Sequence, residues 1–208
     1  MNLPLILSKD NDPWPLRHFK RVLLSSLHWL NRLRFLTNRE TPHLTGPAVM
    51  WLRRYLQTSM KCFEWGSGSS TLFLAKRSFL VVSVEHDMRW HEKVSGWLRS
   101  RKLTNAEVFL IPSDPITRRT SPEYYGRILS YPDEFFDLVL VDGRMRLECA
   151  RNAPAKVRPG GVVLYDDSHR EVDVRSIFRG WETIVFSSMI SQTSIFLKPG
   201  TSPSHGHT

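Results

Sequence analysis

An acidic residue and two glycines stand between an apolar run and a helix-compatible segment in the stretch CFEWGSGSST, residues 62–71. Gly66 and Gly68 allow the backbone to turn sharply and to approach a ligand closely, and the helix that follows points its first N–H groups toward the same place. The turn contains no lysine of the type found in phosphate-binding GxxxxGK[ST] loops. An ordinary tight strand-to-helix turn uses the same glycines, so other positions have to decide whether a ligand binds here.

Acidic residues also follow each candidate strand downstream of this turn. Glu85 comes about twenty residues past the glycines, where nucleotide-binding folds place an acid that accepts hydrogen bonds from ribose hydroxyls. Asp114, Asp142 and the pair Asp166-Asp167 follow the next three strands. A single acid after a strand is commonly a helix cap or a solvated loop residue. Together with the acid of the glycine turn, however, these positions predict one shared edge of a parallel sheet.

The segments that carry these residues alternate between strand-like and helix-like patterns. The strand-like runs are short and rich in Val, Leu, Ile and Phe, as buried parallel strands are: 60–64, 80–85, 107–111, 136–142 and 161–166. Helix-compatible segments between them cover 71–77, 89–101 and 147–156. This alternation predicts an α/β fold, with a parallel sheet covered by helices on both faces.

The pattern changes near the C-terminus. Two strand-like runs, 181–187 and 193–198, are joined by too few residues for a helical crossover. They predict an antiparallel hairpin that completes a mostly parallel, seven-stranded sheet. We assign residues 59–198 to this domain and expect the tail, residues 199–208, to be disordered.

The first 58 residues are predicted to form a helical extension. Between Pro13 and Leu36 apolar residues recur at spacings of three and four, with lysine and arginine on the other face. This basic face belongs either to a helix packed on the domain or to a peripheral membrane or partner contact. A second helix is predicted from Gly46 to Gln57, with Pro47 in its first turn, where a missing N–H does no harm.

Composition limits the class of protein without selecting a partner. The 208 residues are 41% hydrophobic and 24% charged, as in ordinary soluble globular proteins. No stretch approaches the ~20 apolar residues of a transmembrane helix, and no signal-peptide pattern is present, so we expect a cytoplasmic location. Cys62 and Cys149 have neither metal-binding nor disulfide-type spacing. The net charge of +9 is compatible with nucleic acid, anionic lipid or acidic metabolites.

From about residue 60 to residue 198 the sequence resembles the class I S-adenosylmethionine-dependent methyltransferases. The resemblance rests on the acid-x-Gly-x-Gly turn, on Glu85, and on the runs FDLVLVDG (136–143) and VRPGGVVLYDD (157–167). The terminal hairpin distinguishes this family from nicotinamide-binding Rossmann domains. Ser70 stands where the family pattern often has a third glycine.

The resemblance implies a Rossmann-like fold and a role for each motif in binding S-adenosylmethionine. In the family, the residues that match Glu64, Gly66 and Gly68 surround the methionine part of the cofactor. The match to Glu85 holds the ribose, and the match to Asp114 contacts the adenine. A carboxylate and bare backbone suit the ammonium and carboxylate ends of this phosphate-free molecule. The residues assigned to the cofactor are Glu64, Gly66, Ser67, Gly68, Ser70, Thr71, Glu85, His86, Ser113, Asp114 and Asp142.

The residues after the fourth and fifth strands restrict the methyl acceptor. The turn at 142–145 reads Asp-Gly-Arg-Met rather than the Asn/Asp-Pro-Pro-aromatic turn of amino-group methylation. Asp166 stands where ribose 2′-O-methylation places a lysine, and neither cysteine is placed for cytosine C5 chemistry. We therefore expect O-methylation of a small-molecule or glycan hydroxyl. The alternatives are an RNA methyltransferase with the same cofactor site and an inactive binding module.

Asp142, Asp166 and Asp167 resemble the metal site of catechol and caffeoyl-coenzyme A O-methyltransferases, where Asp, Asp and Asn hold a divalent ion. Hard oxygen ligands suit Mg²⁺, Ca²⁺ or Mn²⁺, which makes Mg²⁺ a candidate second cofactor. Here the third ligand is Asp, and Met145 stands where a general-base lysine is expected. Without a metal, Asp142 and Asp166 would line the cofactor and acceptor pocket, and Asp167 would cap a helix.

Candidate catalytic groups follow the same two strands. If no metal binds, Asp142 or His169 is the candidate base. Arg144 and Arg146 either hold a carboxylate or phosphate of the acceptor or pair with the neighbouring aspartates. The segment 115–132, between the third and fourth strands, is a candidate acceptor lid.

Overall fold

The computed structural model describes residues 40–114, 116, 120–170, 173–188 and 191–200. These residues belong to one compact unit, which begins at Glu40. The helix predicted between Pro13 and Leu36 and the tail from residue 201 lie outside the described residues.

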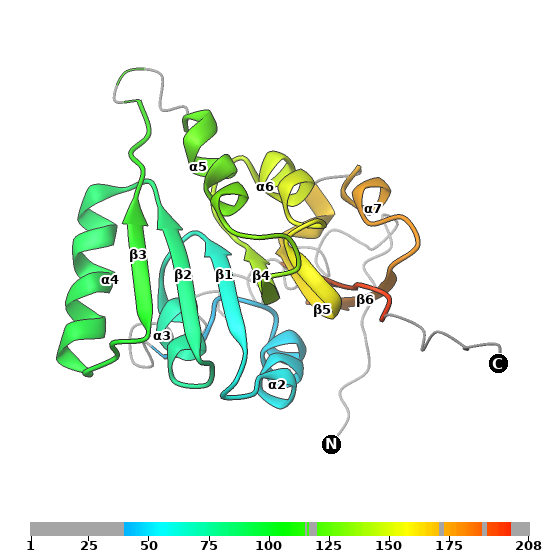
Figure 1. Cartoon of the computed structure of the whole chain (residues 1–208), viewed down its shortest axis with the longest axis horizontal. Helices are drawn as coiled ribbons and strands as arrows, with labels where there is room; N and C mark the ends of the chain where they lie inside the picture. Colours follow the sequence, from blue (N-terminus) through cyan, green and yellow to red (C-terminus); the bar gives the residue numbers. More distant parts are fainter. Residues whose placement is uncertain (1–39, 115, 117–119, 171–172, 189–190, 201–208) are drawn as a thin grey trace, which may run out of the picture. The chain divides into compact units, whose positions relative to one another are not determined.

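A mixed sheet forms the centre of this unit, and within the described residues its strand order is β3-β2-β1-β4-β5-β7-β6 (Figure 1). Neighbouring strands from β3 to β5 pair in parallel, and β7 is antiparallel to both β5 and β6. This confirms the predicted sheet and its C-terminal hairpin. The strands are β1 (Lys61–Trp65), β2 (Leu80–Glu85), β3 (Ala106–Leu110), β4 (Phe136–Val141), β5 (Val157–Asp166), β6 (Glu182–Ser187) and β7 (Gln192–Leu197).

Helices cover both faces of the sheet, as predicted. One face packs against α2 (Gly46–Tyr55), α3 (Ser69–Ala75) and α4 (Met88–Ser100). The other packs against α5 (Pro122–Gly126), α6 (Arg146–Asn152) and α7 (Val174–Ile177), with the short 3₁₀ turns η1 (Arg127–Ser130) and η2 (Ser168–Arg170) nearby. Helix α2 buries Val49 and Leu52 in the first of these cores. The domain boundary predicted after residue 58 therefore separates residues that pack together.

Strand β1 lies between β2 and β4, and helices pack on both faces of the sheet, so both faces of β1 are buried. Side chains alternate along a strand. Phe63 and Trp65 therefore face the core under α5 and α6, whereas Cys62 faces the core under α2 and α3. Glu64 shares the face of Cys62 and is fully buried. The central position of β1 thus places a carboxylate in the protein interior at the edge where strand order reverses.

The loops after β1 and β4 meet backbone to backbone. Gly66 has φ 92°, and a Cβ at that position would lie 2.8 Å from the Cα of Gly143. A Cβ on Gly143 would in turn lie 2.9 Å from the nitrogen of Gly66 and would overlap the hydroxyl of Tyr124. Tyr124 is fully buried, and its carbonyl accepts a 2.9 Å hydrogen bond from the indole Nε1 of Trp65. Both glycines are therefore required for the close approach of the two loops.

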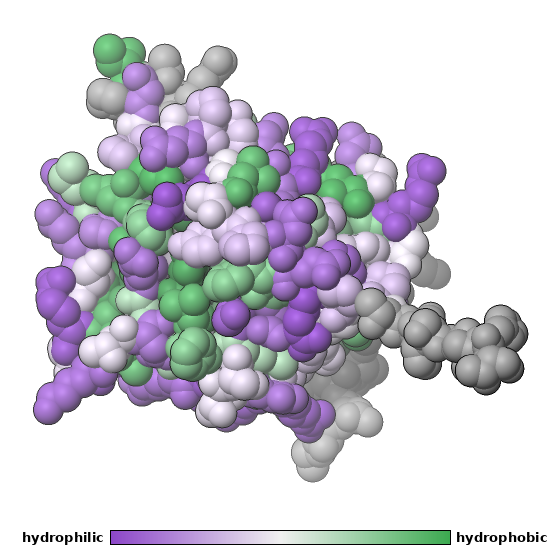
Figure 2. Space-filling view, in the orientation of Figure 1, coloured by the Kyte–Doolittle hydropathy of each residue, from purple (hydrophilic) through white to green (hydrophobic). Residues whose placement is uncertain are grey.

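The surface is mixed in character. Figure 2 shows polar residues spread over the visible face, with apolar residues between them. Within the described part of the chain, no helix has the length and apolar content needed to cross a membrane.

Replacing Gly143 with alanine should destabilise the fold by about 1–3 kcal/mol, because the new methyl group meets buried backbone and a buried tyrosine. Urea unfolding measures the change. Gly46→Ala is the matched control, since its Cβ would have no atom within 4 Å, and its free energy of unfolding should change by less than about 0.5 kcal/mol. Equal unfolding midpoints for the two variants would contradict the close loop contact.

Candidate cofactor and active site

Glu64 is a buried carboxylate without a hydrogen-bond donor. Its side chain is fully buried, and neither carboxylate oxygen has a hydrogen-bond partner among the described residues. Burial raises the pKa of Glu64 to about 7, although nearby hydroxyl groups, that of Thr71 first, oppose the rise. An unpaired buried acid costs free energy when it ionises. The residue therefore suits a ligand that brings positive charge and N–H donors.

The glycine turn after Glu64 is fixed from two sides. Trp90 of α4 donates its indole N–H to the carbonyl of Ser67 at 2.6 Å, and the nitrogen of Gly68 donates to the hydroxyl of Thr71 at 2.9 Å. A Cβ on Gly68 would meet only the indole of Trp90, at 3.8 Å. The backbone at Gly68 is thus bare and held in place, as the predicted approach of a ligand requires.

Glu85, the predicted ribose ligand, already has several hydrogen bonds. Its Oε2 accepts from the nitrogen and hydroxyl of Ser67 at 3.0 and 2.9 Å. Its Oε1 accepts from the nitrogens of His86 and Asp87 at 2.8 and 2.9 Å. Burial favours the neutral acid, but the bonds from His86, Asp87 and Ser67 outweigh it and lower the pKa of Glu85. A ribose hydroxyl would have to displace the Ser67 hydroxyl or share an oxygen with it, so this contact stays a prediction.

The residues predicted near adenine lie beyond β2 and β3. The nitrogen of Ser113 donates to the carbonyl of His86 at 3.4 Å, and the Ser113 hydroxyl is buried without a partner among the described residues. Asp114 is exposed, and its Oδ1 accepts from the nitrogen of Ile116 at 3.0 Å. The ring of His86 meets that of Tyr124 edge to face, with centroids 6.0 Å apart. These positions are compatible with an adenine site, but the contact of Asp114 with adenine stays a prediction.

The segment predicted to be an acceptor lid is partly core. Residues 122–130 form α5 and η1, in which Tyr124 and Ile128 are fully buried. A segment with such anchors cannot open without exposing apolar surface, so the lid prediction is wrong for this part. Residues 115 and 117–119 lie outside the described residues.

The three aspartates predicted to bind a divalent ion are occupied by the protein's own groups. The guanidinium of Arg146 lies 3.1 Å from Asp142 Oδ1 and 3.2 Å from Asp167 Oδ2. Asp166 instead accepts a 2.9 Å hydrogen bond from the hydroxyl of Thr193. The described residues contain no group of three His, Cys, Asp or Glu side chains that could hold a metal. These acids do not fit the predicted Mg²⁺ site, because an arginine stands between two of them.

Ionisation of the same acids is strongly perturbed. Burial and the neighbouring Asp166 raise the pKa of Asp142 well above its usual range, and Arg146 opposes the rise. Burial also raises the pKa of Asp166, against the hydrogen bond from Thr193. A carboxylate whose pKa is raised is a stronger base than an ordinary aspartate. This favours Asp142 as the candidate base.

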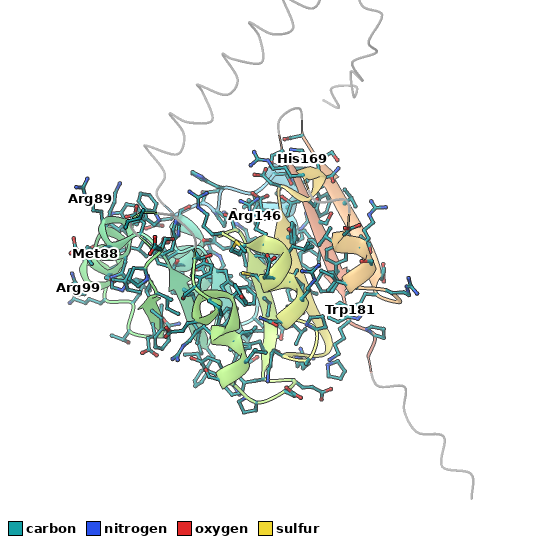
Figure 3. All side chains as sticks on the ribbon, turned by 90° about the horizontal axis from the view of Figure 1, so that it is seen from above. Met88, Arg89, Arg99, Arg146, His169 and Trp181 are labelled. Carbon is teal, nitrogen blue, oxygen red and sulfur yellow. The ribbon has the colours of Figure 1, made fainter. Side chains whose placement is uncertain are left out.

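The other two predicted catalytic residues, His169 and Arg144, are exposed. His169 is exposed in η2, which contacts β7 through Ser168 and Gln192. Figure 3 shows His169 on the side of the C-terminal hairpin and Arg146 nearer the middle of the sheet. Arg144 is also exposed, and its Nε lies 3.5 Å from His86 Nε2. A catalytic role for His169 or Arg144 stays a prediction.

The sequence predicted no role at the site for Trp90, and it placed Tyr124 only within the candidate lid. Trp90 fixes the glycine turn through Ser67, and Tyr124 packs under Gly143. Each is an aromatic residue far along the chain from its partner, and neither belongs to a motif. Only the folded structure brings them to the site.

Comparison with known proteins identifies the fold. No family profile and no curated protein matches the chain. Among solved structures, a Streptococcus mutans protein described as a candidate methyltransferase and solved with SAH has a TM-score of 0.58 and 12% identity, over 76% of this chain and 98% of that chain. An rRNA methylase of Streptococcus thermophilus has a TM-score of 0.58 and 13% identity, over 76% and 99%. A methyltransferase-like protein of Silicibacter pomeroyi has a TM-score of 0.56 and 22% identity, over 79% and 93%.

The chain has the class I methyltransferase fold. In open α/β sheets ligands bind beyond the carboxyl ends of the strands, where strand order reverses. In this methyltransferase fold the reversal lies between β1 and β4, and the Glu64 turn and Asp142 stand at that point. The comparisons thus show the fold, and the candidate site rests on the sheet topology and the geometry above.

The ionisation of Glu64 should appear in the pH dependence of stability. Its pKa is about 7 in the folded chain, against 4.5 for the ordinary group, so the folded state binds more protons between these values. The free energy of unfolding should therefore fall as pH rises through this window, by about 3 kcal/mol for this group. In Glu64→Gln this contribution is absent, so urea unfolding at pH 5 and pH 8 should give a smaller loss than in the parent protein.

Glu107→Gln provides the control, because Glu107 is an exposed glutamate of β3. Its pH dependence should match that of the parent protein. Parallel stability curves for the parent protein and Glu64→Gln would show that Glu64 is not an uncompensated buried acid.

Proposed function

We propose that this chain is a methyltransferase that binds S-adenosylmethionine beyond β1 and β2 and methylates a hydroxyl group of a small molecule or glycan. The observation that carries the cofactor assignment is the buried, donor-free carboxylate of Glu64 beside a bare glycine turn. An ammonium group supplies both the charge and the hydrogen bonds that this carboxylate lacks. The other end of the methionine part suits the backbone N–H groups at the start of α3.

The residues around the turn would orient the cofactor. Ser67 is held by Glu85 and Trp90, so the turn keeps its shape before the ligand arrives. Such preorganisation reduces the entropy that binding would otherwise lose. When bound, S-adenosylmethionine supplies an electrophilic methyl group on its sulfonium sulfur. The chain then has two tasks. It places the acceptor hydroxyl in line with the methyl group, and it accepts the proton of that hydroxyl.

Asp142 is the proposed proton acceptor. It follows β4, and its backbone lies against the glycine turn, because a Cβ on Gly66 would be 2.9 Å from the Asp142 carbonyl oxygen. Its side chain is 23% exposed, which leaves it accessible to an acceptor hydroxyl. The raised pKa of Asp142 supports this role. The proposed reaction uses no divalent ion, since Arg146 already pairs with two of the three aspartates.

RNA methylation is the second candidate. The net charge of +9 favours a polyanionic partner, and an rRNA methylase is among the similar structures. The turn at 142–145 and the acid at 166 favour a small hydroxyl acceptor instead, because they differ from the motifs of nucleic-acid methylation. The proposal also includes a cytoplasmic location. For the helix predicted between Pro13 and Leu36 it keeps two alternatives, packing on the domain and a peripheral membrane or partner contact.

Calorimetry with S-adenosylmethionine and S-adenosylhomocysteine tests the cofactor assignment. At pH 7.5 both should bind, and Glu64→Gln should weaken binding by about tenfold to hundredfold, the usual value of a hydrogen bond to a charged group. Lowering the pH to 5.5 should weaken binding to the parent protein by about tenfold or more, because Glu64 is then protonated. Glu64→Gln should lack this pH dependence, and Glu107→Gln should bind as the parent protein does. Absence of binding to the parent protein would refute the assignment.

A methyl-transfer screen tests the acceptor. With labelled cofactor, label should enter hydroxyl-bearing small molecules or saccharides, and Asp142→Asn should lower kcat by about 10²–10⁴-fold, the usual contribution of a general base, with a smaller effect on cofactor affinity. Label in RNA, with affinity that falls steeply as salt rises, would instead select the second candidate and leave the cofactor site intact.

A further inference from the structure

We infer that Arg146 is a built-in cation that takes the place of a divalent metal ion between the ends of β4 and β5. The resemblance to metal-dependent O-methyltransferases predicted a metal at Asp142, Asp166 and Asp167, and the structure instead brings an arginine side chain to these acids. The inference concerns which cation this site holds. It can therefore be tested without measuring methyl transfer, and it does not depend on the proposed reaction.

The guanidinium of Arg146 is surrounded by oxygen atoms of the two loops. Nε lies 3.1 Å from the Gly143 carbonyl, and Nη2 lies 3.1 Å from Asp142 Oδ1 and 3.5 Å from the Asp142 carbonyl. Nη1 lies 3.1 Å from the Asp166 carbonyl and 3.2 Å from Asp167 Oδ2. Four of these contacts are hydrogen bonds and the contact with Asp167 is an ion pair, so every nitrogen of the guanidinium has an oxygen partner. We call these five oxygens the oxygen cluster.

The backbone of both loops is shaped around this side chain. Met145, directly before Arg146, has φ 48°, and Asp167 has φ 53°. Both angles lie in the left-handed region, which non-glycine residues adopt at a cost of about 1 kcal/mol or more. The turn at Met145 starts α6 at Arg146, so that an arginine four residues after Asp142 reaches back to it. The contacts of Arg146 offset the cost of these turns.

Arg146 also remains charged. Its side chain is only 18% exposed, and burial would lower its pKa, but Asp142 and Asp167 more than compensate and raise it. Asp167 has a second partner in Arg170 at 3.2 Å, on a side chain that is 64% exposed. The exposed Arg170 thus pairs with the Asp167 carboxylate of the oxygen cluster, whereas Arg146 contacts oxygen atoms of both the Asp142 loop and the Asp167 loop.

The oxygen cluster has the composition of a hard-cation site. Two carboxylate and three carbonyl oxygens are the ligands that Ca²⁺, Mg²⁺ and Mn²⁺ prefer. A divalent ion could enter the same place only if Arg146 left it. Arg146 is thus a positioning residue: it joins the Asp142 loop to the Asp167 loop and sets the Asp142 carboxylate without a metal.

The test is a Mn²⁺ titration of the full-length protein, purified in the presence of a chelator and then freed of it. The parent protein should show no Mn²⁺ site by calorimetry or electron paramagnetic resonance in the micromolar range. Arg146→Ala should gain a Mn²⁺ site at least about tenfold tighter than any in the parent protein, because it leaves the oxygen cluster without a cation. Asp142→Asn in the Arg146→Ala background should remove the new site.

Two further variants test whether the effect depends on the positive charge at residue 146 and on the position of the arginine. Arg146→Lys keeps a positive charge and should gain no Mn²⁺ site. Arg170→Ala removes an arginine that pairs with Asp167 but lies outside the bridge, and it should titrate as the parent protein does. If Arg146→Ala does not fold, as judged by circular dichroism, Arg146→Gln is titrated instead, with the same expectation. A Mn²⁺ site in the parent protein that Asp142→Asn abolishes, or a folded uncharged variant that binds Mn²⁺ no better than the parent, would overturn the inference.

Discussion

The carboxylate of Glu64 lies in the interior of the protein with no hydrogen-bond donor among the described residues, and this constraint organises the site. Its burial follows from the helices that cover both faces of the sheet at β1, the strand between β2 and β4. The apolar surroundings raise its pKa to about 7, so the folded chain carries an acid that is costly to ionise. A buried acid with a perturbed pKa is a candidate ligand-binding group, and the backbone nearby at Gly68 is bare, since a Cβ there would meet only the indole of Trp90.

The acids that follow β4 and β5 differ from Glu64, because they already have a cationic partner. Asp142 and Asp167 receive a cation from the chain itself, the guanidinium of Arg146, which also binds three backbone carbonyls. One edge of the sheet therefore carries an acid that lacks a cation and a pair of acids that already has one. In the proposed function, the unpaired Glu64 binds the positively charged end of the cofactor, and the Arg146 pairing holds Asp142 near the acceptor. The positive charge of Arg146 also reduces the repulsion between these neighbouring carboxylates.

Much of the fold was predictable because buried parallel strands have a distinct composition. The strand predicted over 80–85 coincides with β2, and the hairpin was inferred from the short link between 187 and 193. The short α5 and α7 gave no periodic signal, and part of the segment interpreted as a lid proved to be core around Tyr124. For Arg146 the sequence left two partners open. The choice depends on the left-handed turn at Met145, which no pattern of residue types reveals.

A crystal structure of the complex with S-adenosylhomocysteine would test the central claim most directly. The account predicts that the amino group of the ligand lies within hydrogen-bond distance of the Glu64 carboxylate, with its carboxylate end at the backbone of the turn that contains Gly68. A ligand bound elsewhere on the chain, or one whose amino group is held by other residues while Glu64 keeps no partner, would contradict it.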